Sequence, residues 1–170
     1  MPDRLAPGRY LLDPASSTVT LRHKTFWGLK TVPGGFGGLR ASGEIAADGT
    51  AHGTLAIDAA SLDTKHAKRD EHLRSAHFFD VEQHPEITFE TASVTPSTDG
   101  TVSVEGDLTV RGSSRKLAFT ANYEADGTEA VVVRGTVAID RKAHGLTWNM
   151  LGMLTGPATV DLDLRFTAQP

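Results

Sequence analysis

The seven histidines are the residues of this chain whose chemistry is most open to a functional interpretation. Four of them share one neighbourhood: His66, His72, His77 and His84. Their spacings match no HExxH motif and no other helical pair of metal ligands. His66 and Asp70, four residues apart, can face the same way on a helix, but two ligands do not make a metal site. We therefore predict no metal site and favour solvated or capping roles for these side chains.

Catalytic motifs are not found in the sequence either. Its serines lie in no Gly-x-Ser-x-Gly elbow, and the glycine-rich run Pro33–Gly38 stands between strands, where we interpret it as a loop and not as a phosphate cradle. His23 differs because it falls on the inward row of its strand. A buried imidazole there needs a hydrogen-bond partner, and the polar head of a ligand is one candidate. We predict no catalytic residue and no cofactor. An enzyme acting on a hydrophobic substrate, with His23 or His72 as acid or base, is the alternative.

Composition narrows the classes of function. The 170 residues suit one domain, and the lack of cysteine excludes disulfides, thiolate zinc sites and thiol catalysis. A net charge of −4 without a concentrated basic face argues against nucleic acid as a partner. No segment approaches the ~20 apolar residues that span a bilayer, and the first residues lack the apolar core of a signal peptide. We expect a cytoplasmic protein, or a periplasmic or extracellular one if an export signal has been removed.

Alternation of apolar and polar residues predicts that β-strands are the elements that position any site. A period of two is typical of strands with one buried face. It recurs in the runs 17–27, 39–45, 51–57, 102–110, 117–123, 131–139 and 160–166. The pairs Asp48-Gly49, Asp99-Gly100, Asp126-Gly127 and Arg111-Gly112 separate such runs and supply the positive φ angles of tight hairpins. Consecutive hairpins favour an antiparallel barrel, because closure removes exposed strand edges.

One stretch of the chain breaks the alternation, between Leu62 and Pro85. Good helix formers over Thr64–Arg74 predict one short helix lying over a barrel end, with Thr64 as its N-cap.

Four of the inward rows contain a glycine: Gly43, Gly53, Gly106 and Gly135. Such glycines either bend the strands and mark bulges, or leave an elongated void that accepts an apolar guest. The segment 145–154, with one tryptophan and two methionines, is either a permissive apolar wall or a loop that plugs the barrel or packs on another protein.

Motifs in order along nearly the whole chain resemble the YceI-like, polyisoprenoid-binding family. The central ones are Ser61–Thr64, Arg69–Ser75, Phe78–Asp80 and His84–Phe89. The others are Asp13 with Ser17–Val19, His23 and Gly34–Phe36 near the start, Gly106–Gly112, and Ile139–Arg141 with Gly145-Leu146.

The resemblance implies an all-β fold: a single extended, antiparallel, eight-stranded, lipocalin-like barrel over residues 1–170, with one short helix over one end. It also implies that the barrel encloses a long apolar isoprenoid lipid (a polyprenol, polyprenyl phosphate or prenylated quinone), that the chain carries or sequesters it, and that two chains form a homodimer. Transient membrane contact fits such a role without a transmembrane segment. The predicted ligand-binding residues are His23, Phe26, Trp27, Phe36, Arg69, Phe78, Phe79, Phe89, Leu108, Phe119, Arg141, Trp148, Met150 and Met153, among which His23, Arg69 or Arg141 would meet a polar head.

The chain departs from the family pattern at three points. It shows no signal peptide, Ser16 stands where the family often has histidine, and His144 stands where an aromatic residue is common. These departures bear on location and on recognition of the head group. A third interpretation, a filled barrel whose Trp148 segment binds a protein, predicts no internal void.

Overall fold

The computed structural model describes residues 5–25, 30–76, 78–127, 129–139 and 155–170. Of residues 23–25, 30–32 and 155–157 it describes the backbone alone.

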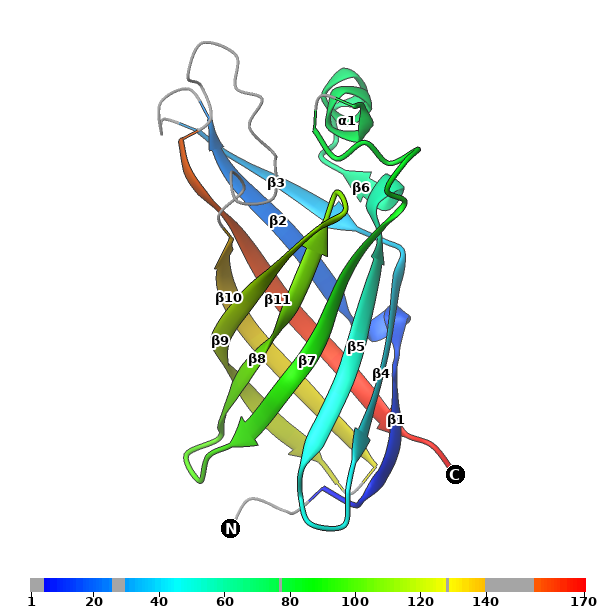
Figure 1. The fold of residues 1–170 in the computed structure, drawn as a ribbon, viewed down its shortest axis with the longest axis vertical. Coiled ribbons are helices and arrows are strands. Elements are labelled where there is room, and N and C mark those ends of the chain that lie inside the picture. The colour runs from blue at the N-terminus through cyan, green and yellow to red at the C-terminus, as the bar shows by residue number, and fades with distance from the viewer. Residues whose placement is uncertain (1–4, 26–29, 77, 128, 140–154) are drawn as a thin grey trace.

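In the described residues nearly all of the regular structure is antiparallel strand, together with one α-helix, α1 (Ala67–Arg74) (Figure 1). The strands are β1 (Gly8–Leu12), β2 (Thr18–Thr25), β3 (Lys30–Phe36), β4 (Leu39–Ile45), β5 (Ala51–Asp58), β6 (Leu62–Asp63), β7 (Glu86–Pro96), β8 (Thr101–Val110), β9 (Ser113–Asp126), β10 (Ala130–Ile139) and β11 (Thr155–Ala168). They form one sheet in the order β1-β4-β5-β7-β8-β9-β10-β11-β2-β3-β6, which closes because β1 also pairs with β11.

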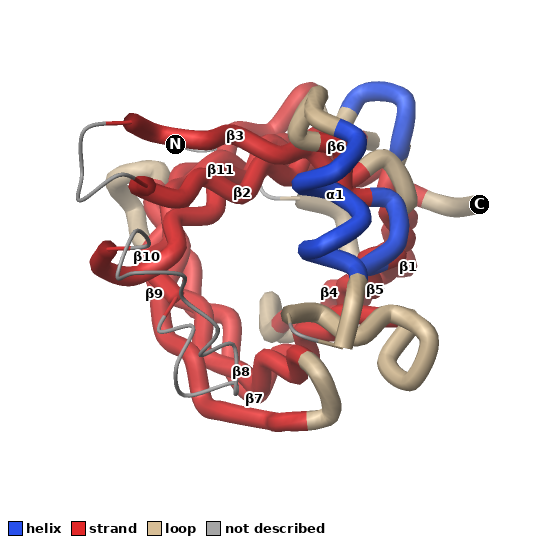
Figure 2. The backbone as a smooth tube through the Cα atoms, turned by 90° about the horizontal axis from the view of Figure 1, so that it is seen from above, coloured by secondary structure: helices blue, strands red, loops and turns tan. Residues whose placement is uncertain are grey.

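The closed barrel has eight strand positions, as predicted. Three positions are each filled by two consecutive strands. β11 pairs with β2 along Thr155–Asp163 and with β1 along Phe166–Ala168, so β1 and β2 lie end to end beside it. In the same way β3 pairs with β2 while β4 pairs with β1, and β6 pairs with β3 while β5 pairs with β4. Seen from above, the backbone forms a ring with α1 over one side of its opening (Figure 2).

The predicted turn residues close the hairpins. Gly49, Gly100 and Gly127 have φ angles of 89°, 85° and 67°, and the turn between β8 and β9 places both Arg111 and Gly112 at positive φ. In Figure 1 the hairpins β4–β5, β7–β8 and β9–β10 lie at the end of the barrel opposite to α1. We call this the hairpin end and the other the helix end.

The glycine-rich run after Pro33 is not the loop that the sequence suggested. Residues up to Phe36 belong to β3 and pair with β2. The glycine at 34 is needed for packing and not for flexibility: a Cβ atom there would lie 2.7 Å from Cδ1 of Leu62 and 2.8 Å from Cγ2 of Thr64. The strand therefore uses a bare position to accept β6 and the residue that follows it.

The helix exists where it was predicted but begins two residues later. His66, not Thr64, is the N-cap, and its Nδ1 accepts a hydrogen bond from the Arg69 amide at 3.2 Å. Lys65 has a φ of 64°, in the left-handed region, so a right-handed helix cannot run through it. Thr64 is left outside the helix, buried beneath it.

Candidate functional site

A cavity of about 840 Å³ runs through the interior of the barrel. This lies toward the upper end of the ~300–1,000 Å³ typical of ligand pockets. On β8, β10 and β11 the wall consists of alternate residues, as a pleated strand with one inward face requires. These residues are Val102, Val104, Leu108, Val110, Val131, Val133, Val137, Ile139, Ala158, Val160, Leu162, Leu164 and Phe166. Such a surface binds hydrocarbon and offers little to a polar guest.

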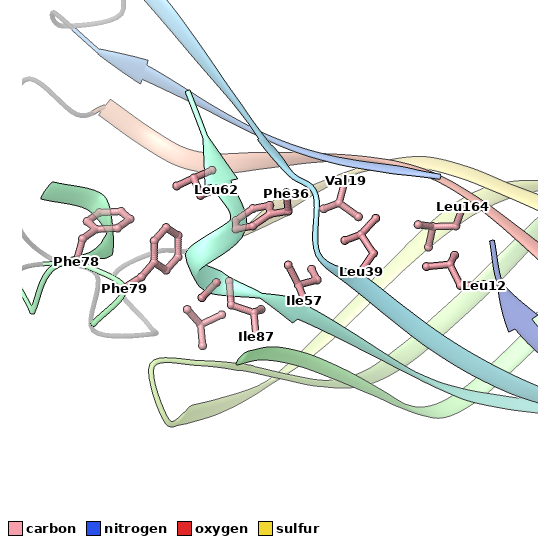
Figure 3. Close-up of a cluster of buried hydrophobic side chains, with 12 residues drawn as sticks. Leu12, Val19, Phe36, Leu39, Ile57, Leu62, Phe78, Phe79, Ile87 and Leu164 are labelled. Atoms are coloured by element: carbon pink, nitrogen blue, oxygen red, sulfur yellow. The ribbon is translucent and has the colours of Figure 1, made fainter. Parts of the chain in front are cut away.

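Three phenylalanines form the wall at the helix end. Phe78 and Phe79 follow α1, and their rings meet edge to face with centroids 4.8 Å apart. The ring of Phe79 also lies edge to face with that of Phe36 from β3, at 6.4 Å. All three are buried, and Figure 3 shows them in one continuous cluster with Leu62, Ile57 and Ile87. The chain segment after the helix therefore supplies part of the barrel core.

A second aromatic group lies on the wall formed by β7, β8 and β9. Phe89 and Phe119 have ring centroids 5.7 Å apart, and Phe89 stands directly opposite Leu108 in the ladder. Phe89, Phe119 and Leu108 are only partly buried, although they point to the interior, and all three line the cavity. Their exposed surface faces the cavity, so it is available to a guest.

The inward glycines fit both interpretations of the sequence. Gly43 and Gly53 are direct cross-strand partners on β4 and β5, and both line the cavity. Cβ atoms on them would lie 3.1 Å and 2.9 Å from the carbonyl oxygens of the facing strand. A Cβ atom on Gly106, opposite an irregularity of β7, would lie 2.3 Å from the Glu90 carbonyl oxygen, and one on Gly135 would meet Ala121 Cβ at 3.2 Å. All four glycines therefore allow close strand packing, and the first two also leave space in the cavity wall.

A buried hydrogen-bond network fastens α1 to the barrel. The carboxylate of Asp70, 5 % exposed, accepts hydrogen bonds from the Thr64 amide at 3.0 Å and from the Thr64 hydroxyl. Arg69 donates from Nε to the Thr64 hydroxyl at 2.8 Å and from a terminal nitrogen to the Thr64 carbonyl at 2.6 Å. Arg74 donates to the Leu62 carbonyl at 2.7 Å. These charged groups hold the segment together and do not line the cavity.

The phenol of Tyr10 is the best buried polar group of the cavity wall. Its hydroxyl donates to the Ala6 carbonyl at 2.7 Å, which fixes residues 5–7 along the hairpin end. Burial raises the pKa of Tyr10, so the phenol stays neutral at physiological pH. Within the described part of the chain, no group of three or more histidine, aspartate or glutamate side chains is placed to hold a metal ion.

The model of the YceI-like domain family matches residues 10–168. The chain belongs to the YceI-like domain family. A UPF0312 protein of Ectopseudomonas mendocina is 32 % identical over 116 residues, a match covering 65 % of this chain and 58 % of that protein. The chain thus aligns with little more than half the length of this relative.

Two solved structures share the fold. The crystal structure of Burkholderia cenocepacia BcnA superposes with a TM-score of 0.81 at 18 % identity, covering 91 % of this chain and 98 % of that one. A polyisoprenoid binding domain from Saccharophagus degradans, implicated in plant cell wall breakdown, superposes with a TM-score of 0.75 at 17 % identity, covering 94 % and 98 %. Among the described residues, no helix of this YceI-like chain is long and apolar enough to cross a membrane.

The structure places the predicted site residues in three groups. Six of them line the cavity: Phe36, Phe78, Phe79, Phe89, Leu108 and Phe119. Arg69 is bound to Thr64 and is not part of the cavity wall, so its contact with a head group stays a prediction. Outside the described residues or side chains lie His23, Phe26, Trp27, Arg141, Trp148, Met150 and Met153. His72, the alternative acid or base, is on α1 and does not line the cavity.

Sequence reasoning missed the parts of the wall contributed by β1 and β4 and one residue of β7. Tyr10, Ala41 and Ile87 line the cavity but were not predicted as site residues. Ala41 belongs to an alternating run that the sequence already assigned to a strand. Its inward position could therefore be predicted, because every second residue of that run faces the interior. The runs around Tyr10 and Ile87 are short or rich in threonine and glutamate, and they give a weaker signal.

Proposed function

We propose that this protein binds a long-chain isoprenoid lipid inside its barrel and carries or sequesters it. The observation that supports this most directly is the apolar cavity of about 840 Å³, bounded by alternate residues of successive strands. The filled-barrel interpretation does not agree with such a void. The similar domain from Saccharophagus degradans is described as polyisoprenoid binding, which supports an isoprenoid as the class of ligand.

Burial of hydrocarbon supplies the affinity. Each buried methylene is worth roughly 0.8 kcal/mol, so about twenty of them provide on the order of 16 kcal/mol before the costs of association. Those costs are about 4–15 kcal/mol. A long hydrocarbon chain that carries no polar substituents can therefore bind in the cavity without a specific contact to its head group. A polyprenol or prenylated quinone meets this requirement, and so does the tail of a polyprenyl phosphate.

We propose binding and not catalysis as the activity. Most of the described wall is aliphatic or aromatic, its acidic and histidine members Glu44, Asp48 and His52 are exposed near the β4–β5 hairpin, and His72 lies apart from it. We further propose that two chains pair as a homodimer, which sedimentation equilibrium of the purified protein would test by its mass.

The test of the proposed function is to fill the cavity. Ala41 points inward on β4 and lines the void, so Ala41→Trp places an indole in the space of the ligand. We expect the affinity for geranylgeraniol, measured by isothermal titration, to fall at least tenfold. Thr120→Trp on the exposed outer face of β9 is the matched control and should bind as the wild type does. Native mass spectrometry with organic extraction then identifies any lipid that copurifies. A wild-type chain that binds neither polyprenols nor quinones would overturn the proposal.

A further inference from the structure

The barrel wall is incomplete between β5 and β7. Backbone pairing of these strands begins at Asp58 opposite Glu86 and ends at Thr54 opposite Glu90. Toward the hairpin end, the described pairings join residues 51–53 of β5 only to β4, and residues 93–96 of β7 only to β8. In Figure 1 the two strands diverge below this point. We call the space between residues 51–53 and 93–96 the slit.

A bulge in β7 explains why the strands separate. The register of β7 against β8 shifts between Thr91 and Ser93, and a bulge bends its strand and increases the local twist. Gly106 accommodates the bulge, because its missing Cβ leaves room for the Glu90 carbonyl. At the same level the Gly53 amide donates to the Thr91 hydroxyl at 2.8 Å instead of continuing the ladder. This bond is the last described link across the two strands.

The cavity reaches the slit. The residues that line it include 51–53 of β5, whose edge toward β7 has no described backbone pairing. On the opposite edge it reaches Val94 and Pro96 of β7. An apolar path thus connects the interior with the outside through the wall.

Both ends of the barrel carry chain that narrows them. The helix end holds α1, β6 and the buried rings of Phe78 and Phe79 (Figures 1 and 3). At the hairpin end, residues 5–7 line the cavity and are held by the hydrogen bond from Tyr10 to Ala6. Moving α1 aside requires breaking the buried Thr64–Asp70 network, whereas widening the slit requires breaking one part-buried hydrogen bond.

We propose that the slit is the route by which the isoprenoid ligand enters and leaves the barrel. This inference rests on the proposed function. A slender, flexible hydrocarbon chain passes sideways between β5 and β7, while α1 and the segment after it stay in place. The route predicts that obstruction at the slit changes the rates of exchange and leaves the equilibrium affinity unchanged.

The test uses the lack of cysteine in the chain, which makes an introduced thiol unique. Ser93 lies on the exposed outer side of the slit, and Glu71 is exposed on α1 at the helix end. Ser93→Cys and Glu71→Cys are each coupled to a bulky polyethylene glycol maleimide. Stopped-flow fluorescence then follows binding and release of geranylgeraniol that carries a dansyl group on its alcohol end. We expect the label at 93 to slow both rates at least tenfold with a dissociation constant within twofold of wild type, and the label at 71 to change neither rate.

A second variant moves the rates in the opposite direction. Thr91→Val keeps the shape of the side chain but removes the acceptor of the Gly53 amide. We expect both rates to rise severalfold, while Thr95→Val, on the exposed face of the same strand, leaves them unchanged. Unchanged rates with the label at 93, or slowing by the label at 71 alone, would show that the route lies elsewhere. A wild-type chain that binds no probe at equilibrium would instead overturn the proposed function and the route with it.

Discussion

The two ends of the barrel are packed differently, although the same strands run through both. At the helix end, buried aromatic rings pack against one another and charged side chains are consumed by hydrogen bonds to neighbouring backbone. Toward the hairpin end, Gly43 and Gly53 face each other without side chains, and along the wall between the two ends the rings of Phe89 and Phe119 are left partly uncovered. The contrast indicates that packing is tightest at the helix end and that the rest of the wall leaves more surface for a ligand.

The largest effect that this contrast predicts is on the free energy of unfolding when an aromatic side chain is truncated to alanine. Phe79→Ala removes a buried ring from the packed helix end and should lower the free energy of unfolding by about 3–5 kcal/mol. Phe119→Ala removes a ring that already borders a void, and should cost only about 1–2 kcal/mol. Urea denaturation of the two variants measures the difference. Equal losses would mean that the cavity wall is as tightly packed as the helix end.

A smaller effect is expected for the buried carboxylate. Asp70→Asn weakens acceptance from the Thr64 amide and hydroxyl in a buried position, at a cost of about 1–3 kcal/mol. Asp107→Asn, on the exposed face of β8, is the control and should change stability by less than about 0.5 kcal/mol. Ligand affinity should be the same in both variants, because neither residue lines the cavity. A loss of affinity in Asp70→Asn alone would place the helix segment in the binding site.

The smallest expected effect is a loss of hairpin stability at acidic pH. Hydrogen bonds from Thr50 hold the pKa of Asp48 below its ordinary value, and those from Thr101 do the same for Asp99. A carboxyl whose pKa is depressed by folding stabilises the fold above its unfolded pKa of about 3.9, and that contribution is lost as the pH falls through the lower folded pKa. Hydrogen exchange, corrected for its intrinsic rate, should therefore show the β4–β5 and β7–β8 turns loosening between pH 5 and pH 3. Turns that stay equally protected at both pH values would contradict this.

The strand pattern was predictable from the sequence because it depends on parity and turn chemistry. Alternation around Val102–Val110 and Val131–Ile139, with Asp-Gly pairs between runs, places the inward residues without knowledge of tertiary contacts. The same reasoning identified Leu108 and Phe119 as wall residues, whereas Phe89 was predicted from the family resemblance.

The features that the sequence did not predict depend on contacts between distant segments. The sequence predicts a loop at Gly34, because the packing of Leu62 and Thr64 against this position cannot be read from the local sequence. The helix start depends on the positive φ of Lys65, which no local propensity announces. The slit depends on how a bulge in β7 meets a pair of glycines on β4 and β5, and no single segment encodes that arrangement.

Closure of the barrel by its first and last strands has a consequence for folding. Tyr10 pairs with Ala168, so the ring is complete only when the final strand is available. During synthesis the inward rows of β4 to β10 have no enclosed interior and stay open to solvent and to chaperones. Contacts of such long sequence separation slow folding, and open strand edges favour aggregation in the meantime. An enclosed interior therefore forms only after β11 has been made, and the yield on refolding should be limited by the docking of β11.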